Sequence, residues 1–154
     1  MRKANVPVVP GSLGAVKDEE EALDLAEEIG YPVMIKASAG GGGRGIRIVS
    51  SSEELKGAYN TAKAEALNAF GDDTMYMEKF VKNPKHIEIQ ILGDSFGNIV
   101  YLGERDCSVQ RRNQKMLEEA PSSVMTEGLR KRMGEAAVRA AKAANYKSAG
   151  TIEF

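Results

Sequence analysis

The residue pattern with the clearest chemical meaning is the glycine run at residues 40–45, interrupted only by Arg44. Glycine has no Cβ, so its backbone N–H groups can approach a phosphate closely and adopt positive φ angles. The run fits the G-x-G-x-x-G pattern of dinucleotide sites, but that pattern needs a helix next, and residues 46–49 alternate like a strand. A Walker A loop needs Lys-Ser or Lys-Thr after its last glycine, and Ile46 stands there instead. The run therefore predicts a hairpin lid over phosphates; a surface hairpin that binds nothing is the alternative.

One lysine, Lys36, lies in an otherwise apolar strand pattern at residues 33–37, just before the glycine run. A buried ammonium is costly unless an anion neutralises it, and a phosphate oxygen would do so. The other interpretation is a side chain that extends from a half-buried strand to solvent. The neighbouring glycines favour the phosphate.

The strand pattern at residues 75–81 ends in an acidic-basic pair, Glu78 and Lys79. Backbone groups at such an end could pair with the edge of an adenine ring, and Glu78 could accept from its amino group. A solvated strand end is the alternative. The single histidine, His86, is expected on residue type alone to be a surface or structural side chain.

Residues 103–119 form the most densely charged stretch, which mixes both signs with amides. The stretch is too polar and irregular for a core helix. It is either a solvated loop or a polar wall around an anionic substrate, in which Arg and Lys supply charge. Cys107 is expected to be an inert, partly buried thiol, because the sequence places no identifiable base nearby, although Arg105 and Arg111 could lower its pKa.

Glu153 lies between Ile152 and Phe154 in a terminal strand pattern. Successive strand residues face opposite sides, so its carboxylate points away from these two apolar neighbours. It suits a ligand for Mg²⁺ at nucleotide phosphates; a plain exposed glutamate is the alternative.

These residues need elements to position them, and the apolar spacing predicts their order. We expect a helix over 18–29, a helix opened by a Ser51–Glu54 capping box, and a helix capped by Thr126. The expected strands cover residues 33–37, 46–49, 75–81, 86–92, 99–102 and 149–154.

Composition narrows the class of protein. The 154 residues carry a net charge of −1, which disfavours a general nucleic-acid binder. One cysteine and one histidine exclude a disulfide framework and a cysteine- or histidine-rich metal site. The apolar runs are too short to span a bilayer, and the N-terminus does not resemble a signal peptide. We therefore expect a cytoplasmic protein that does not contact a membrane. Because the chain stops inside a strand, we expect a fragment of a longer protein.

Several segments resemble the biotin carboxylase family of ATP-grasp enzymes. The matching stretches are residues 37–45, 76–80, 83–90, 103–112, 114–115, 118–121 and 149–154. The Glu-Arg-Asp-Cys-Ser stretch at 104–108 separates this family from other ATP-grasp ligases. The resemblance runs essentially from end to end.

The resemblance implies an α/β (α+β) ATP-grasp fold: a mixed or antiparallel sheet, helices packed on one face and a glycine-rich hairpin lid. Residues of about 9–80 and 81–154 would form the lid subdomain and the start of the C-terminal ATP-grasp part, after a preceding segment of about 1–8. The alternatives are another ATP-grasp carboxylate ligase and a non-catalytic nucleotide-binding module.

The implied activity is carboxylation of biotin on a carrier protein with MgATP, or the Mn²⁺ equivalent, and bicarbonate. The parent would be a homodimer that works with a biotinylated carrier protein and a carboxyltransferase. The expected final carboxyl acceptor is acetyl-CoA, as in acetyl-CoA carboxylase, and propionyl-CoA, pyruvate and urea are the alternatives.

The resemblance also assigns roles by position. The nucleotide contacts would be Lys36 at the phosphates, Gly42 and Gly43 in the lid, Glu78, Lys79 and Val81 at adenine, and His86 and Gln110 in the pocket. Lys115 would be the catalytic contact to bicarbonate, and Glu153 would bind nucleotide and metal. Asn113, a further expected nucleotide contact, replaces a histidine of many family members and cannot titrate.

Other catalytic residues of the family would follow Phe154. These are a second metal carboxylate and the asparagine, arginine and glutamate that orient bicarbonate and biotin. We therefore expect the chain by itself to be catalytically silent.

Overall fold

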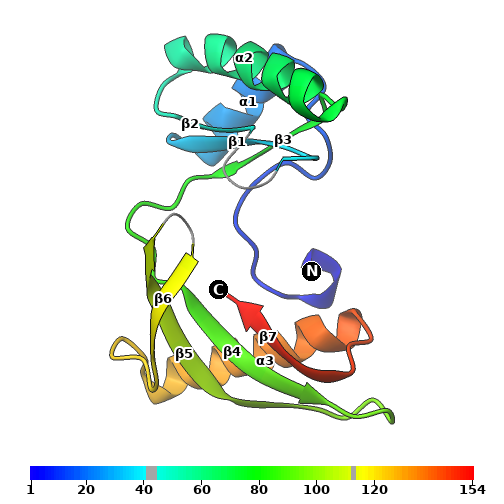
Figure 1. Ribbon diagram of the computed structural model, residues 1–154, viewed down its shortest axis with the longest axis vertical. Helices are drawn as coiled ribbons and strands as arrows, with labels where there is room; N and C mark the ends of the chain where they lie inside the picture. Colours follow the sequence, from blue (N-terminus) through cyan, green and yellow to red (C-terminus); the bar gives the residue numbers. More distant parts are fainter. Residues whose placement is uncertain (41–44, 112–113) are drawn as a thin grey trace. The chain divides into compact units, whose positions relative to one another are not determined.

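The computed structural model describes residues 1–40, 45–111 and 114–154, and Figure 1 traces them. The chain divides into two compact units. The first unit is Val9–Lys82, and the second unit combines Met1–Val8 with Asn83–Phe154. Three predicted nucleotide contacts, Gly42, Gly43 and Asn113, lie outside the described residues.

The first unit is a three-stranded antiparallel sheet covered by helices on one face (Figure 1). Its strands are β1 (Val33–Ala37), β2 (Ile46–Val49) and β3 (Met75–Lys79), in the order β2-β1-β3. The helices are α1 (Glu19–Ile29) and α2 (Ser52–Phe70). The predicted antiparallel pairing of the two strands that flank the glycine run is confirmed.

Alternation along β1 decides which side chains meet the helices. Val33, Ile35 and Ala37 are buried in a core that α1 and α2 complete. Met34 and Lys36, which alternate with them, therefore lie on the opposite face of the sheet. A lysine in an apolar strand is tolerated here because its side chain leaves the core.

The helix ends follow side-chain chemistry, with one exception. Asp18 caps α1 by accepting a hydrogen bond from the backbone N–H of Glu21 at 2.9 Å. The predicted Ser51–Glu54 capping box is wrong. Glu54 accepts instead from the backbone N–H of Ser50 at 3.0 Å, and the Ser51 side chain makes no capping hydrogen bond to the helix.

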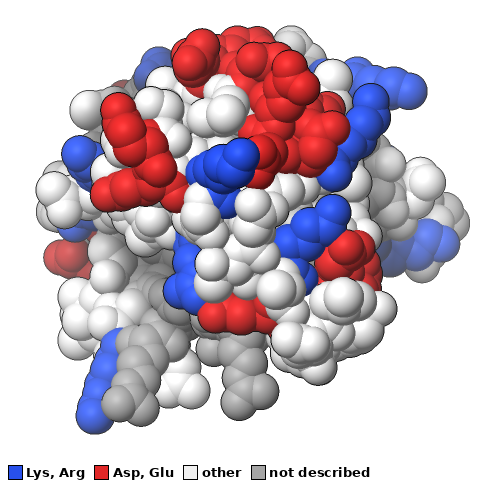
Figure 2. Space-filling model, turned by 90° about the horizontal axis from the view of Figure 1, so that it is seen from above, with Lys and Arg blue, Asp and Glu red and all other residues white. Residues whose placement is uncertain are grey.

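The outer face of the helices is acidic. Figure 2 shows Asp and Glu side chains gathered on the side of the molecule that carries α1 and α2. Six acidic residues lie on α1: Glu19, Glu20, Glu21, Asp24, Glu27 and Glu28. Their negative potential repels phosphates, so a nucleotide is better accommodated on the opposite, lysine-bearing face of this sheet.

The second unit is a four-stranded antiparallel sheet with one long helix on it (Figure 1). Its strands are β4 (Ile87–Gly93), β5 (Ile99–Arg111), β6 (Gln114–Glu119) and β7 (Ser148–Glu153), in the order β6-β5-β4-β7. The helix is α3 (Glu127–Ala143), and a short 3₁₀ helix, η1 (Arg2–Ala4), begins the chain.

The core of the second unit lies between α3 and one face of the sheet. Ile89 and Ile91 of β4 pack there against Ala137 and Ala141 of α3. The predicted common face of the β4 isoleucines is confirmed, and so is the Thr126 cap, whose Oγ1 accepts from the Leu129 N–H at 3.2 Å. No helix in the described part of the chain is both long and apolar enough to cross a bilayer.

The charged stretch is a β-hairpin, so its interpretation as a solvated loop is wrong. The strand expected over 99–102 continues as β5 to Arg111 and pairs with β6. The sequence of β5 does not show the alternation of apolar and polar residues typical of a strand, because charged residues occupy buried positions. Glu104 and Asp106 are both 6% exposed. These carboxylates have partners, as buried charges require.

Glu104 and Asp106 connect the sheet to α3 and to the segment before it. Arg130 makes two 2.7 Å hydrogen bonds to Glu104 through Nε and a terminal nitrogen. Asp106 accepts from the Ser108 backbone N–H at 3.0 Å and from Ser122 Oγ and Lys85 Nζ, each at 3.2 Å. The Ser108 hydroxyl also donates to Asp106, at 2.5 Å, and it contributes most to lowering the pKa of Asp106 to about 2.

Asp106 makes the second unit sensitive to acid. Its folded pKa lies below the ordinary 3.8, so its stabilisation is present above about pH 4 and is lost as the pH falls towards 2. We expect the free energy of unfolding of the wild type to fall by ~2 kcal/mol more than that of Asp106→Asn over this range. Urea unfolding at a series of pH values measures the difference, and parallel curves would contradict it.

Candidate functional site

The first group of predicted site residues lies on the face of the β2-β1-β3 sheet opposite the helices. Lys36 of β1 and Glu78 of β3 form an ion pair there, with side chains 38% and 36% exposed. The anion beside Lys36 in this structure is thus a carboxylate. Both side chains remain accessible enough to exchange this partner for a ligand, because a solvent-exposed pair is worth only about 0–1 kcal/mol.

An apolar strip beside this ion pair escaped the sequence reasoning. Ile46 of β2 lies directly across from Lys36, and Ile48 lies across from Met34. Ile46 and Ile48 are 36% and 51% exposed. The missed signal is the Ile-Arg-Ile-Val alternation, which predicted a strand but not that its isoleucines face solvent. Apolar strand residues beside a lysine suit a flat ring that carries an anionic tail.

Two further predicted adenine contacts are Lys79, whose side chain is already hydrogen-bonded within the protein, and Val81, whose side chain is exposed. Lys79 donates from Nζ to the carbonyls of Gly30 and Tyr31 at 2.8 and 2.9 Å. Its backbone N–H donates to Pro10 at 2.8 Å, so Lys79 holds together the turns around β3. Val81 lies beyond the end of β3 and is 48% exposed.

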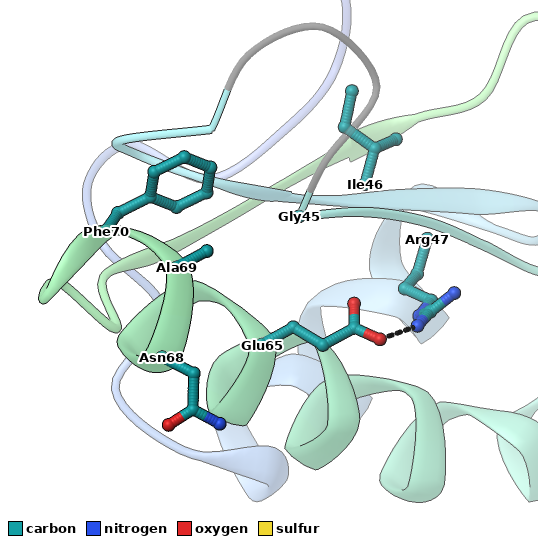
Figure 3. Close-up of a pocket in the computed structure, with 7 residues that line it drawn as sticks. All are labelled: Gly45, Ile46, Arg47, Glu65, Asn68, Ala69 and Phe70. Carbon is teal, nitrogen blue, oxygen red and sulfur yellow. Dashed lines mark hydrogen bonds and ion pairs between the residues drawn. The ribbon is translucent and has the colours of Figure 1, made fainter.

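A pocket of about 560 Å³ opens between β2 and the C-terminal half of α2 (Figure 3). Ile46 and Phe70 supply apolar wall, and Arg47 and Glu65 form an ion pair across it. Its described lining residues include none of the predicted nucleotide contacts. The pocket shares Ile46 with the apolar strip beside Lys36, but neither Lys36 nor Glu78 lines it.

The second group lies on the face of the β6-β5-β4-β7 sheet opposite α3. Glu88 of β4 is at its centre and is 3% exposed. Its direct cross-strand neighbours are Arg105 of β5 and Glu153 of β7. Two carboxylates in directly opposed positions repel each other unless a cation lies between them.

Lys115 of β6 is that cation. Its Nζ lies 2.5 Å from Glu88 Oε2 and 2.6 Å from Glu153 Oε1. Hydrogen bonds to Glu153 and Glu88 raise the pKa of Lys115, so it is an ammonium at neutral pH. Burial alone would raise the pKa of Glu88, but hydrogen bonds from Lys115 and Arg105 hold this pKa below its usual range. The hydrogen bond from Lys115 likewise lowers the pKa of Glu153.

His86 and Gln110 lie around this cluster. His86 Nε2 lies 3.4 Å from Glu153 Oε1, but it is buried and has no hydrogen-bond partner among the described residues. Gln110 is the cross-strand partner of Lys115, and its side-chain nitrogen donates to the Cys107 carbonyl at 2.9 Å. The structure therefore brings together His86, Gln110, Lys115 and Glu153, which lie up to 67 positions apart in the sequence.

The cluster offers oxygen ligands for a metal ion. One ligand atom each from His86, Glu88 and Glu153 lies within 4.8 Å of the others. Mg²⁺ prefers carboxylate, phosphate and water oxygens, so Glu153, with its side chain 53% exposed, fits it at the phosphates of a bound nucleotide. Glu88 is less suited because Arg105 and Lys115 already engage its two oxygens.

Cys107 lies beneath this cluster, with its Sγ within 4.8 Å of one carboxylate oxygen each of Glu88 and Glu118. Its side chain is fully buried, and burial raises the pKa of the thiol despite the nearby Arg105. The expectation of an inert thiol fits this placement, since a reactive cysteine needs exposure and a low pKa.

Comparison with known proteins identifies the family to which this chain belongs. The family model described as "Carbamoyl-phosphate synthase L chain, ATP binding domain" matches residues 1–154. The biotin carboxylase of Nostoc sp. is 60% identical over 154 residues, which are 100% of this chain and 34% of that protein. The chain thus spans about a third of that relative's length.

Two solved structures have the same fold. The Campylobacter jejuni biotin carboxylase–β-γ-ATP complex is 57% identical, with a TM-score of 0.89 over 99% of this chain and 34% of that one. The biotin carboxylase domain dimer of Hydrogenobacter thermophilus 2-oxoglutarate carboxylase, in complex with MgADP, ADP and bicarbonate, is also 57% identical. Its TM-score is 0.87, with the same coverage of both chains.

These likenesses confirm the α/β fold with antiparallel sheets and the family expected from the sequence. The lid itself stays a prediction, because its glycines lie outside the described residues. The chain belongs to the carbamoyl-phosphate synthase L chain ATP-binding domain family, in the form found in biotin carboxylases.

Proposed function

We propose that this chain is the ATP-binding portion of a cytoplasmic biotin carboxylase, which uses MgATP and bicarbonate to carboxylate biotin on a carrier protein. The observation that carries the proposal is the Lys115 ammonium held between Glu88 and Glu153 at 2.5 and 2.6 Å. A 57% identical domain has been solved with MgADP and bicarbonate, the two kinds of ligand that this cluster suits.

Each proposed site residue binds the part of the substrates that its charge and hydrogen-bonding groups suit. Lys36 neutralises phosphate oxygens, and Glu78 and Val81 contact the adenine beside the Ile46–Ile48 strip. The Mg²⁺ supplies charge neutralisation at the phosphates when Glu153 holds it. Lys115 donates hydrogen bonds to bicarbonate and stabilises its negative charge, and His86 Nε2 donates to or accepts from the nucleotide.

The test is turnover by the full-length protein that carries this sequence. With MgATP and bicarbonate present, we expect ATP hydrolysis to rise when free biotin is added. Stimulation by a different acid would instead identify another ATP-grasp ligase. Nucleotide binding without turnover would identify a non-catalytic module.

The 154-residue chain alone is expected to show no biotin-dependent ATP hydrolysis. It spans about a third of the biotin carboxylases it matches, and the second metal carboxylate of the family is expected outside it. A phosphate-release assay with MgATP, bicarbonate and free biotin checks this. Turnover above the buffer background would contradict it.

For the final acceptor we propose acetyl-CoA, with a homodimeric parent that works alongside a biotinylated carrier and a carboxyltransferase. The support is the 60% identity to a protein named simply as a biotin carboxylase, against 57% to a 2-oxoglutarate carboxylase domain. Carboxyl transfer from the purified complex to acetyl-CoA, propionyl-CoA, pyruvate, 2-oxoglutarate or urea decides between them.

A further inference from the structure

The side chain that holds Glu88 in place is Arg105, to which the sequence analysis gave no role in the site. The two residues are direct cross-strand partners on β4 and β5. Arg105 Nε donates to Glu88 Oε1 at 2.6 Å, while Lys115 takes the other oxygen, Oε2, at 2.5 Å. The carboxylate is thus shared between two cations, one on each oxygen.

Arg105 is itself fixed from two more sides. A terminal nitrogen donates to Gln90 Oε1 at 3.1 Å, and Gln90 in turn donates to the backbone carbonyl of Gly150 at 2.9 Å. Glu118 of β6 lies 3.4 Å from Arg105 Nε. The planar guanidinium therefore joins β4, β5 and β6, and reaches β7 through Gln90, in a way that the single charge of a lysine cannot reproduce.

We propose that Arg105 is a positioning residue for the Lys115 ammonium, acting through Glu88. The inference rests on the proposed function, because that function gives Lys115 to bicarbonate. Glu88 is 3% exposed, so its carboxylate cannot turn to water when a partner is lost. Without Arg105, Glu88 would draw Lys115 towards its unpaired oxygen and away from Glu153.

The effect should fall on bicarbonate and spare the nucleotide. For Arg105→Met in the full-length protein, we expect kcat/KM for bicarbonate to drop about tenfold or more, with the Kd for MgADP within about twofold of wild type. Arg105→Lys keeps the charge but cannot serve Glu88 and Gln90 together. It should fold like the wild type and retain most of the bicarbonate defect.

Arg130→Met is the matched control. It removes a second arginine from a second buried carboxylate of the same unit, Glu104, which is 6% exposed. It should lower the melting temperature at least as much as Arg105→Met while leaving kcat/KM for bicarbonate unchanged. Equal bicarbonate defects in the two variants, or full recovery in Arg105→Lys, would overturn the assignment.

A crystal structure of Arg105→Met separates this inference from the proposed function. If the wild type shows no bicarbonate-dependent turnover, the proposed function fails, and the structure still decides the positioning role. We expect Lys115 Nζ to move towards Glu88 Oε1 and its contact with Glu153 Oε1 to be lost or lengthened. An unchanged Glu88–Lys115–Glu153 arrangement would overturn it.

Discussion

Replacing Lys115 with alanine is expected to lower biotin-dependent turnover of the full-length protein about 10²- to 10³-fold. The change removes the ammonium that lies between Glu88 and Glu153, so bicarbonate meets two carboxylates in place of a cation. Nucleotide binding should change less, because Lys36 and Glu78 belong to the other sheet and Glu153 remains to hold Mg²⁺ at the phosphates. Steady-state kinetics and calorimetry with MgADP measure the two effects separately.

Lys85→Ala is the control for that substitution. Lys85 also lies beside a buried carboxylate of the second unit, with its Nζ 3.2 Å from Asp106 Oδ2. Its removal should cost stability without a matching loss of turnover. Equal losses of turnover and of nucleotide affinity in Lys115→Ala would argue against the bicarbonate role.

Replacing Lys36 with alanine is expected to weaken MgATP binding roughly 10- to 100-fold, the loss typical of a charge-assisted bond to phosphate. Stability should hardly change, by less than about 1 kcal/mol, because both partners of the Lys36–Glu78 pair are exposed. Affinity by calorimetry and stability by urea unfolding should therefore separate. A purely structural lysine would give the opposite pattern.

Lys56→Ala provides the comparison in the same unit. Lys56 pairs with Glu19 on the acidic helix side, with its Nζ 2.6 Å from Glu19 Oε1. Lys56 lies on the helix side and its loss only makes that side more negative, so MgATP affinity should stay the same or fall slightly. If Lys56→Ala lowered the MgATP affinity as much as Lys36→Ala, the nucleotide would not bind specifically to the sheet face that carries Lys36.

The elements and the site were predictable from sequence to different degrees. Period-two alternation locates β1 and β2 to the residue, although in β2 the isoleucines face solvent and Arg47 lies on the helix side. The same rule fails at β5, where Glu104 and Asp106 occupy inward positions. Their partners, Arg130 and Lys85, are 26 and 21 positions away, beyond the range of any local pattern.

The candidate site shows the same limit. Single residues such as Lys36 and Glu153 stand out because a charge interrupts an apolar strand. The pairing of Glu88 with Arg105 and Lys115 depends on strand register, which the sequence does not specify across long loops. Resemblance to a family supplied Lys115 and His86, and it gave no part to Arg105.

The one thiol of the chain has a practical use. Cys107 is fully inaccessible and directly follows Asp106 in β5, so a labelling reagent can reach it only when that strand opens. The rate of modification in native conditions would then report the opening free energy of the second unit alone, with no engineered probe. Arg105→Met and Arg130→Met could be compared by this rate before any substrate is added.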